Sequence, residues 1–124
     1  MKTIIITGSN GFIGSSLVDS LSQKYKLILL LRNKSNLKKT NYIFNKNISL
    51  KFFKKNNELS IMLKEIKAPW LIHCATHYIR DHKYKDILEL NKSNIIFGNI
   101  ILENLKIMKT KKFINFSTVW EDYN

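Results

Sequence analysis

Residues 7–14 read Thr-Gly-Ser-Asn-Gly-Phe-Ile-Gly, and the rest of the chain is best interpreted outward from this stretch. It holds three of the four glycines in the sequence. The β-branched run Thr3–Thr7 leads into it and predicts a short buried strand. The apolar residues Ile13, Leu17 and Leu21 follow at the spacing of one helix face. The stretch is therefore a glycine-rich turn between a strand and a helix.

A turn at this position offers an anion-binding site. Gly8 permits the tight turn, Gly11 has no side chain to block a pyrophosphate, and Gly14 lets the helix pack closely. Free amide groups at the helix N-terminus add hydrogen-bond donors and a partial positive charge. We therefore expect a dinucleotide to be bound by the residues of this loop, namely Gly8, Ser9, Asn10, Gly11, Phe12, Ile13 and Gly14. A tight turn without any ligand is the alternative.

The remaining sequence alternates between strand and helix patterns. Continuous apolar runs predict strands, and apolar residues that recur on one helical face predict helices. Further strands are expected at Lys26–Leu31, Ile48–Phe53, Trp70–Cys74 and Phe113–Phe116, and helices at Phe12–Lys24, Glu58–Ile66 and Lys85 to about Met108. Residues 33–47 are polar and show no clear pattern. Buried strands that alternate with helices describe a parallel sheet covered on both faces.

These elements predict an α/β fold, a three-layer α/β/α sandwich of the Rossmann type with a doubly wound parallel sheet of about five strands. The sequence has one proline and no Gly/Ser linker, so residues 1–124 are expected to form one dinucleotide-binding domain. The fifth strand is expected at an open edge of the sheet. Such an edge favours self-association, and a homodimer is one possible result.

The net charge of +12 raises the question of a polyanionic partner. The lysines are scattered along the sequence, and the densest runs fall between predicted elements, where solvated loops belong. We therefore expect no nucleic-acid partner. No apolar run reaches the roughly 18 residues of a membrane span, so no membrane partner is expected. The sequence shows no secretory signal and its single cysteine is Cys74, which favours the cytoplasm.

The loop spacing resembles that of the short-chain dehydrogenases/reductases, and the fuller pattern T-G-x-x-G-F-I-G is similar to their extended branch, the NAD-dependent epimerases/dehydratases. The segment His73-Cys74-Ala75-Thr76 resembles the one that lines the dinucleotide after the fourth strand in that branch. Residues 90–102 resemble its long helix, and residues 113–120 resemble its fifth strand and the loop that follows. The form F-I-N-x-x-T-x-W is most similar to nucleotide-sugar reductases and epimerases that serve lipopolysaccharide and O-antigen sugars.

This resemblance implies an NAD(P)-dependent oxidoreductase or isomerase, an epimerase, dehydratase or reductase whose substrate is a nucleotide sugar. It implies that Cys74, Ala75 and Thr76 line the dinucleotide. It also implies that Thr118 hydrogen-bonds the substrate oxygen, with Ser117 in that role if the alignment shifts by one residue. Asn91 matches the helix asparagine that holds the long helix and a proton-relay water. The alternative for Asn91 is a polar residue on an exposed helix face.

The catalytic tyrosine and lysine implied by the resemblance are missing from their expected place. In the family, Tyr-x-x-x-Lys follows the fifth strand beyond the position of Thr118, whereas this sequence ends at Asn124. The Tyr-x-x-x-Lys at residues 42–46 falls between the second and third strands and is rejected as a catalytic site. We therefore expect a truncated fold without the catalytic helix and substrate domain, which binds dinucleotide without turnover. A non-catalytic NADP(H)-binding module or sensor is the alternative.

The end of the second strand bears on the choice of cofactor. An acidic residue there usually binds the ribose 2′-hydroxyl of NAD, but this sequence has Arg32-Asn33-Lys34. Basic groups suit the 2′-phosphate of NADP, so NADP is expected in preference to NAD, although a strand-ending arginine can simply be solvated. Asn56 or Asn57 is expected in place of the acidic residue that often contacts adenine. His73 and Cys74 point to opposite faces of a strand, so no metal site is expected.

Overall fold

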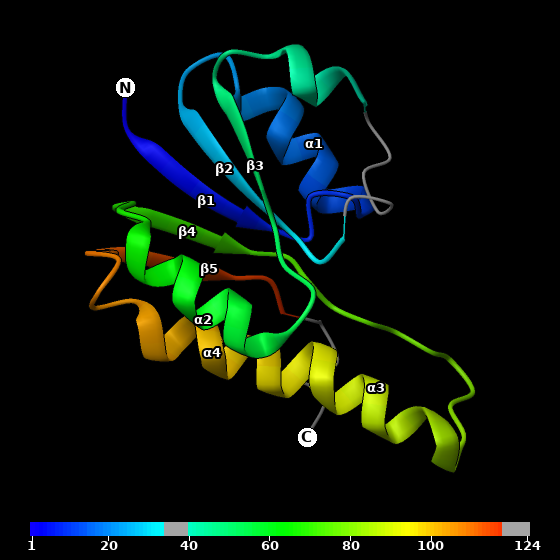
Figure 1. Ribbon diagram of the computed structural model, residues 1–124. Coiled ribbons are helices and arrows are strands. Elements are labelled where there is room, and N and C mark those ends of the chain that lie inside the picture. Colours follow the sequence, from blue (N-terminus) through cyan, green and yellow to red (C-terminus); the bar gives the residue numbers. More distant parts are fainter. Residues whose placement is uncertain (34–39, 118–124) are drawn as a thin grey trace.

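The computed structural model describes residues 1–33 and 40–117 (Figure 1). These residues form a five-stranded parallel sheet in the order β3-β2-β1-β4-β5. The strands are β1 (Thr3–Thr7), β2 (Lys26–Leu31), β3 (Ile48–Phe52), β4 (Trp70–His73) and β5 (Lys112–Asn115). The helices are α1 (Phe12–Leu21), η2 (Thr40–Phe44), α2 (Asn56–Glu65), η3 (Tyr84–Asp86), α3 (Ile87–Asn91), the π-helical turn η4 (Lys92–Ile96) and α4 (Phe97–Asn104).

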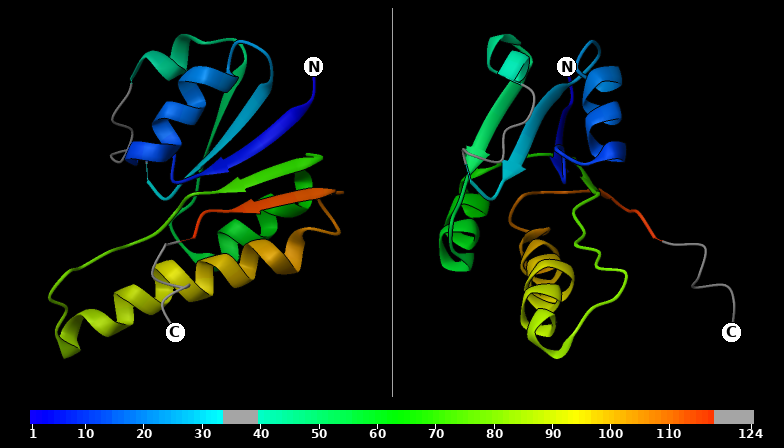
Figure 2. Two further views of the ribbon diagram at one scale, coloured as in Figure 1. Left: turned by 180° about the vertical axis from the view of Figure 1, so that it is seen from behind. Right: turned by 90° about the vertical axis from the view of Figure 1, so that its right-hand side faces the viewer.

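Helices cover both faces of this sheet, which confirms the predicted doubly wound α/β/α sandwich (Figures 1 and 2). Helix α1 lies on one face, while α2 and the α3–η4–α4 segment lie together on the other. Two apolar clusters fill the space between the layers. In β1, Ile4 and Ile6 pack toward α1, whereas Ile5 packs toward α2 and α4. Side chains alternate along a strand, so a continuous apolar run serves both layers.

The strand order places a topological switch point between β1 and β4. Strand β1 pairs with β2 on one side and with β4 on the other. The connections that leave β1 and β4 therefore run to opposite faces and leave a crevice beyond the carboxyl ends of these strands. In open α/β sheets this crevice is where ligands bind. The loops that follow β1 and β4 are residues 8–11 and 74–83.

All three predicted helices differ in their bounds from those observed, and α2 covers Asn56–Glu65 instead of Glu58–Ile66. Helix α1 ends at Leu21 instead of Lys24, because the next residues form a tight turn in which the Lys24 and Tyr25 amides both donate to the Leu21 carbonyl. The long predicted helix is interrupted by η4 and its α-helical part ends at Asn104 instead of Met108. In the described part of the chain, no helix has the length and apolar character needed to cross a membrane.

Candidate dinucleotide site

The glycine loop between β1 and α1 has a backbone that other residues would not permit. Gly8 adopts a positive φ of 71°, and a Cβ added there would lie 2.6 Å from the Ala75 nitrogen. The Gly11 amide donates to the Gly8 carbonyl over 3.0 Å and closes the turn. A Cβ added to Gly14 would overlap the same carbonyl group. The first turn of α1 is therefore held directly against the loop, which in turn is held against the end of β4.

The start of α1 leaves polar groups available to a ligand. Gly11 is the N-cap residue and supplies no side-chain cap, so the amides of the first turn keep their donors free. The Ser9 side chain is only 1% exposed, and its Oγ has no hydrogen-bond partner among the described residues. A buried hydroxyl without a partner costs about 1–3 kcal/mol. An anion at the helix N-terminus would satisfy both the amides and this hydroxyl.

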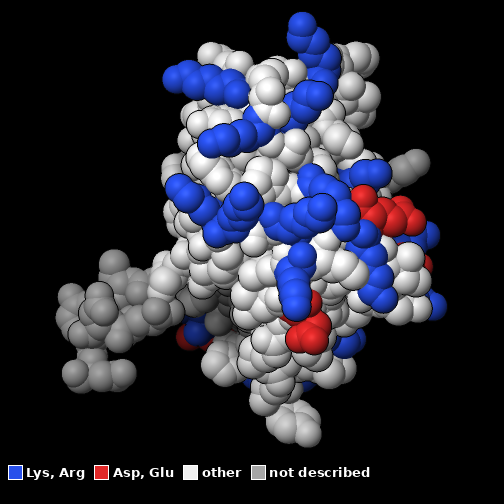
Figure 3. Space-filling view, turned by 90° about the vertical axis from the view of Figure 1, so that its left-hand side faces the viewer, with Lys and Arg blue, Asp and Glu red and all other residues white. Residues whose placement is uncertain are grey.

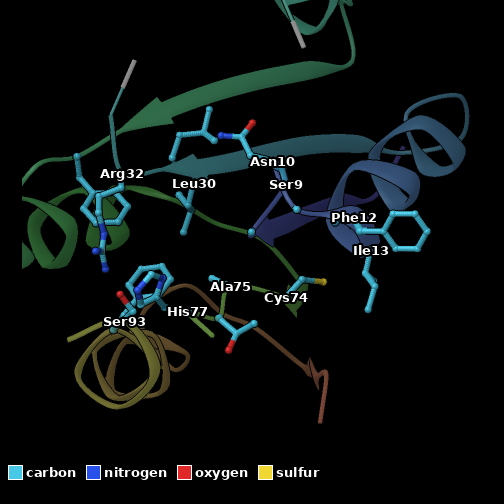
Figure 4. Close-up of a pocket in the computed structure, with 17 residues that line it drawn as sticks. Ser9, Asn10, Phe12, Ile13, Leu30, Arg32, Cys74, Ala75, His77 and Ser93 are labelled. Carbon is cyan, nitrogen blue, oxygen red and sulfur yellow. The ribbon is translucent and has the colours of Figure 1, made fainter. Parts of the chain in front are cut away.

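A cavity of about 500 Å³ opens in front of the loop (Figure 4). Its size is in the range of cofactor sites. The sequence predicted its lining from the glycine loop, Arg32, Cys74, Ala75 and Thr76, and the structure brings all of these together. The Phe12 ring is 93% exposed and points away from the cavity, so the backbone of Phe12 forms the wall. The lining also includes residues that were not predicted, namely Leu30, Leu31, Phe53, His77, Ser93 and Phe97.

A second cavity of about 500 Å³ adjoins the first beyond the end of β2. Arg32 and Phe53 line both cavities. Lys54 and Glu58 line only the second. The Glu58 carboxylate accepts the Lys54 amide at 2.8 Å and the Lys55 amide at 3.4 Å, and these hydrogen bonds lower the pKa of Glu58. The Glu58 carboxylate is therefore engaged with the backbone. The cationic side chains that line the second cavity are Arg32 and Lys54.

The expected adenine contacts differ from the residues found there. Neither Asn56 nor Asn57 lines either cavity. Asn57 instead uses its Oδ1 to accept the Glu58 amide at the start of α2, over 2.9 Å. The groups at this end of the site are Phe53 and Glu58. The sequence offered one signal for Phe53, because it ends the third predicted strand, whereas Glu58 lies in the predicted helix Glu58–Ile66.

A buried hydrogen-bond network supports the loop from behind. Thr7 Oγ1 accepts the Ala75 amide at 3.2 Å and lies 2.8 Å from His73 Nδ1. The Thr7 hydroxyl has one donor and two acceptor sites, so with one lone pair engaged it can still pair with Nδ1 in either tautomer of the His73 ring. Burial lowers the pKa of His73, so the neutral ring is favoured. The network ties the end of β1 to the segment that follows β4.

Asn94 in the π-helical turn fixes the other wall. Its Oδ1 accepts the His77 amide at 2.7 Å and the Thr76 hydroxyl at 3.3 Å, while its Nδ2 donates to the His77 carbonyl at 2.8 Å. The turn η4 also carries Ser93 into the cavity lining. Helical periodicity does not reveal a π-helical turn. The function of Asn94 was therefore not predicted, although it stands three residues after Asn91.

The remaining predicted residues lie outside the cavity lining or outside the described chain. The structure leaves Asn91 exposed on the helix and does not bring it to the cavity. Ser117 is exposed just beyond β5, whose last residues lie beside the end of β4 through the Phe116 amide and the His73 carbonyl. Thr118 falls outside the described residues. Tyr42, which begins the rejected Tyr-x-x-x-Lys, is buried against α1.

The histidines and the cysteine do not form a metal centre in the described chain. There, no three His, Cys, Asp or Glu side chains come close enough to hold an ion. His73 packs on the α4 side of the sheet with Phe97, whereas Cys74 packs on the α1 side. Burial raises the pKa of the Cys74 thiol, which keeps it protonated and weakly nucleophilic.

A family model described as the NAD dependent epimerase/dehydratase family matches residues 4–121 of the sequence. The chain belongs to this family. The matched range takes in the glycine loop, the segment after β4 and β5. The dTDP-D-glucose 4,6-dehydratase of Dictyostelium discoideum is 35% identical over 127 residues, which cover 95% of this chain and 29% of that protein.

Solved structures of related fold superpose closely on the chain. The UDP-glucuronic acid 4-epimerase of Bacillus cereus, solved with UDP-glucuronic acid and NAD, has a TM-score of 0.74 and 26% identity. The match covers 94% of this chain and 40% of the epimerase. A yeast methylglyoxal/isovaleraldehyde reductase solved with NADPH shares the fold, with a TM-score of 0.77, 19% identity and coverage of 94% and 37%. The chain therefore spans less than half the length of these relatives.

Proposed function

We propose that the chain is the dinucleotide-binding part of an NAD(P)-dependent epimerase, dehydratase or reductase that acts on a nucleotide sugar. The observation that carries this proposal is the buried Ser9 hydroxyl, which has no partner among the described residues and lies beside the uncapped start of α1. Family membership gives the chemistry. The dehydratase and the epimerase named above act on dTDP-glucose and UDP-glucuronic acid, and we extend the nucleotide-sugar class, but neither individual sugar, to this chain.

In the proposed complex, each part of the site has a separate task. The free amides of Phe12 and Ile13 and the Ser9 hydroxyl hold the pyrophosphate. The space above Gly11 lets the pyrophosphate approach the backbone. Phe53 and the second cavity hold the adenosine end. The segment Cys74–Thr76 lines the path toward the nicotinamide ring, which supplies hydride transfer when bound.

Arg32 leads us to propose NADP in preference to NAD. It lines both cavities, and Lys54 lines the second one beside it. The nearby carboxylate of Glu58 is engaged by two backbone amides. The guanidinium group of Arg32 and the ammonium group of Lys54 suit a 2′-phosphate, because cations stabilise a bound divalent anion more than they stabilise a bound hydroxyl group.

We propose that this chain alone binds dinucleotide but does not turn over substrate. Ser117 at the carboxyl edge, or Thr118, would hydrogen-bond the substrate oxygen, but the Tyr-x-x-x-Lys that moves the proton in the family is not found after β5. The resemblance of residues 113–120 leads us to propose lipopolysaccharide O-antigen sugar synthesis in the cytoplasm as the setting. The same binding without catalysis would also serve a cofactor sensor.

Titration calorimetry of the 124-residue chain with NADPH and NADH tests the cofactor proposal. We expect one binding site, with NADPH bound more tightly than NADH. Arg32→Ala should weaken NADPH binding about tenfold and leave NADH binding nearly unchanged. Lys85→Ala is the matched control, because it also removes one exposed cation but lies outside both cavities. Equal losses for NADPH and NADH in Arg32→Ala would contradict the proposed 2′-phosphate contact.

We also propose that two copies associate through β5. This strand is an edge of the described sheet; it carries Ile114, which is 48% exposed, and Phe116 follows its end with 44% exposure. An exposed strand edge with apolar side chains favours pairing with another strand. Sedimentation velocity should show a concentration-dependent dimer, and Ile114→Lys should shift it to the monomer. A monomer at all concentrations would exclude the dimer.

A further inference from the structure

The fold gathers lysines that are scattered in the sequence. In a parallel sheet, all strands begin at one edge, and here every strand begins on a lysine or has one within the three residues before it. These lysines are Lys2, Lys24, Lys26, Lys46, Lys67, Lys109, Lys111 and Lys112, and we call them the amino-edge lysines. No Asp or Glu occurs among the same short stretches. Figure 3 views this edge, where Lys and Arg crowd the surface and outnumber the few Asp and Glu that lie beside them.

Strand register sets the innermost of these lysines in a row. Lys26 begins β2 and pairs with Thr3 of β1, directly after Lys2. Trp70 of β4 pairs with Lys112 of β5. Neighbouring strands lie about 4.8 Å apart, so the row from β2 to β5 extends over roughly 14 Å. It follows the edge of the sheet as a line of cations.

Trp70 stands within this row between two of the cations. The Lys2 Nζ lies 5.0 Å from the centre of its ring and the Lys112 Nζ lies 5.1 Å from it. The indole is half-buried and packs beside Tyr25. Both ammonium groups therefore make cation–π contacts with the indole, and Trp70 holds these two cations in the row.

The amino-edge lysines have no acidic partners. None of them forms an ion pair with a carboxylate of the described residues. Among those residues, the ion pair that the structure shows joins Lys92 to Glu89. Their charges are therefore not neutralised locally. The opposite edge holds the glycine loop and the dinucleotide cavity, so the two surfaces are separated by the length of the strands.

We propose that the amino-edge lysines bind a single strand of nucleic acid through its phosphates, without sequence specificity. A linear polyanion matches a linear row of cations that have no carboxylate partner among the described residues. A flat anionic membrane matches it less well, because a membrane would be contacted by a broad patch with apolar anchors. The surface is separate from the dinucleotide cavity, so the two ligands do not compete. This proposal is independent of the proposed enzymatic function.

Fluorescence anisotropy with a labelled 20-nucleotide oligouridylate tests the proposal on the 124-residue chain. The affinity should fall with salt, with a slope of log K against log[salt] of about −3 if roughly four phosphates are contacted. The triple variant Lys2→Gln, Lys26→Gln, Lys112→Gln should bind at least about tenfold more weakly and reduce that slope by about 2. The three lysines are exposed, and thermal unfolding followed by circular dichroism checks that the variant remains folded.

A matched variant distinguishes this surface from general charge attraction. Lys51→Gln, Lys83→Gln, Lys85→Gln removes the same charge from exposed positions away from the strand starts, and it should bind the oligonucleotide almost as the native chain does. The proposal is overturned if both triple variants lose affinity equally, if NADPH displaces the oligonucleotide, or if no binding occurs at low salt. It is also overturned if the chain binds phosphatidylserine vesicles but not the oligonucleotide, since the partner is then a membrane.

Discussion

The carbonyl group of Gly8 occupies the space where any side chain at position 14 would begin. An alanine Cβ at Gly14 would overlap the Gly8 oxygen and lie 2.7 Å from the Gly8 carbonyl carbon. Both partners are backbone atoms of a turn that is itself fixed by the end of β4, so neither can move at low cost. Gly14→Ala should lower the free energy of unfolding by about 1–3 kcal/mol. Urea denaturation measures this change.

Gly98→Ala is the control for the Gly14 prediction. Gly98 lies in α4, where an added Cβ would meet only His73 Nε2 at 3.8 Å, an ordinary contact. Alanine favours the helix over glycine by up to about 1 kcal/mol, so this variant should be neutral or stabilised. If the two alanine variants unfold at the same urea concentration, the close approach of Gly14 to Gly8 does not constrain the fold.

Ser9→Ala should have opposite effects on stability and on binding. The Ser9 hydroxyl is buried without a partner among the described residues, so its removal should raise the free energy of unfolding by about 1 kcal/mol. The same change should weaken NADPH binding about tenfold, because a hydrogen bond to a phosphate is lost. Thermal unfolding and calorimetry on the same samples check the two effects. A variant that is less stable, or one that binds NADPH as before, would show that the hydroxyl has another function.

Stability should depend on pH through His73. Burial lowers the pKa of this ring in the folded chain, so the unfolded chain binds the proton more readily. The contribution of the neutral ring is complete above the ordinary histidine pKa of about 6.5 and is lost as the pH falls below it. His73→Gln should flatten the decline in unfolding free energy between about pH 7 and pH 5. His82→Gln changes an exposed position and should show the same decline in unfolding free energy as the native chain. An equal decline in both variants would show that other groups cause the pH dependence.

Asn94→Ala should loosen the wall of the cavity. The substitution removes three hydrogen bonds to Thr76 and His77, and we expect a loss of about 1–2 kcal/mol in the free energy of unfolding. Hydrogen exchange of the His77 amide should become faster. Asn91→Ala on the same helix serves as the comparison and should change stability by less than about 0.5 kcal/mol, because Asn91 is exposed. A larger loss of stability in Asn91→Ala would support the predicted function of Asn91, which is to hold the long helix.

Local patterns in the sequence predicted most of the fold. The bounds of β1 and β2 agree with the apolar runs that predicted them, because both strands are buried on both faces. The glycine loop was predictable because a strand, a tight turn and a helix follow one another within a few residues, and this arrangement leaves little room for side chains at the three glycines. The second and fourth strands supplied Arg32 and the segment Cys74–Thr76 to the same cavity, because parallel strands end at one edge.

Features that depend on contacts between distant residues were not predictable in the same way. The π-helical turn places Asn94 against His77, and a regular helical periodicity gives no indication of it. Arg32, which follows strand β2, and Glu58, which lies in helix α2, line the same second cavity. The amino-edge lysines were read as scattered because strand starts are far apart in the sequence and adjacent only in the sheet. Register and crossover geometry, not composition, bring them together.

The most direct test of the central claim is a nuclear magnetic resonance titration of the ¹⁵N-labelled chain with NADPH. The amides of Phe12 and Ile13 in the first turn of α1 and of the N-cap residue Gly11 should shift strongly as NADPH is added, together with those of Ala75 and Thr76 across the cavity. Amides at the amino ends of the strands should remain unchanged. Absence of shifts in the glycine loop at millimolar NADPH, or shifts confined to the amino edge, would contradict the dinucleotide site.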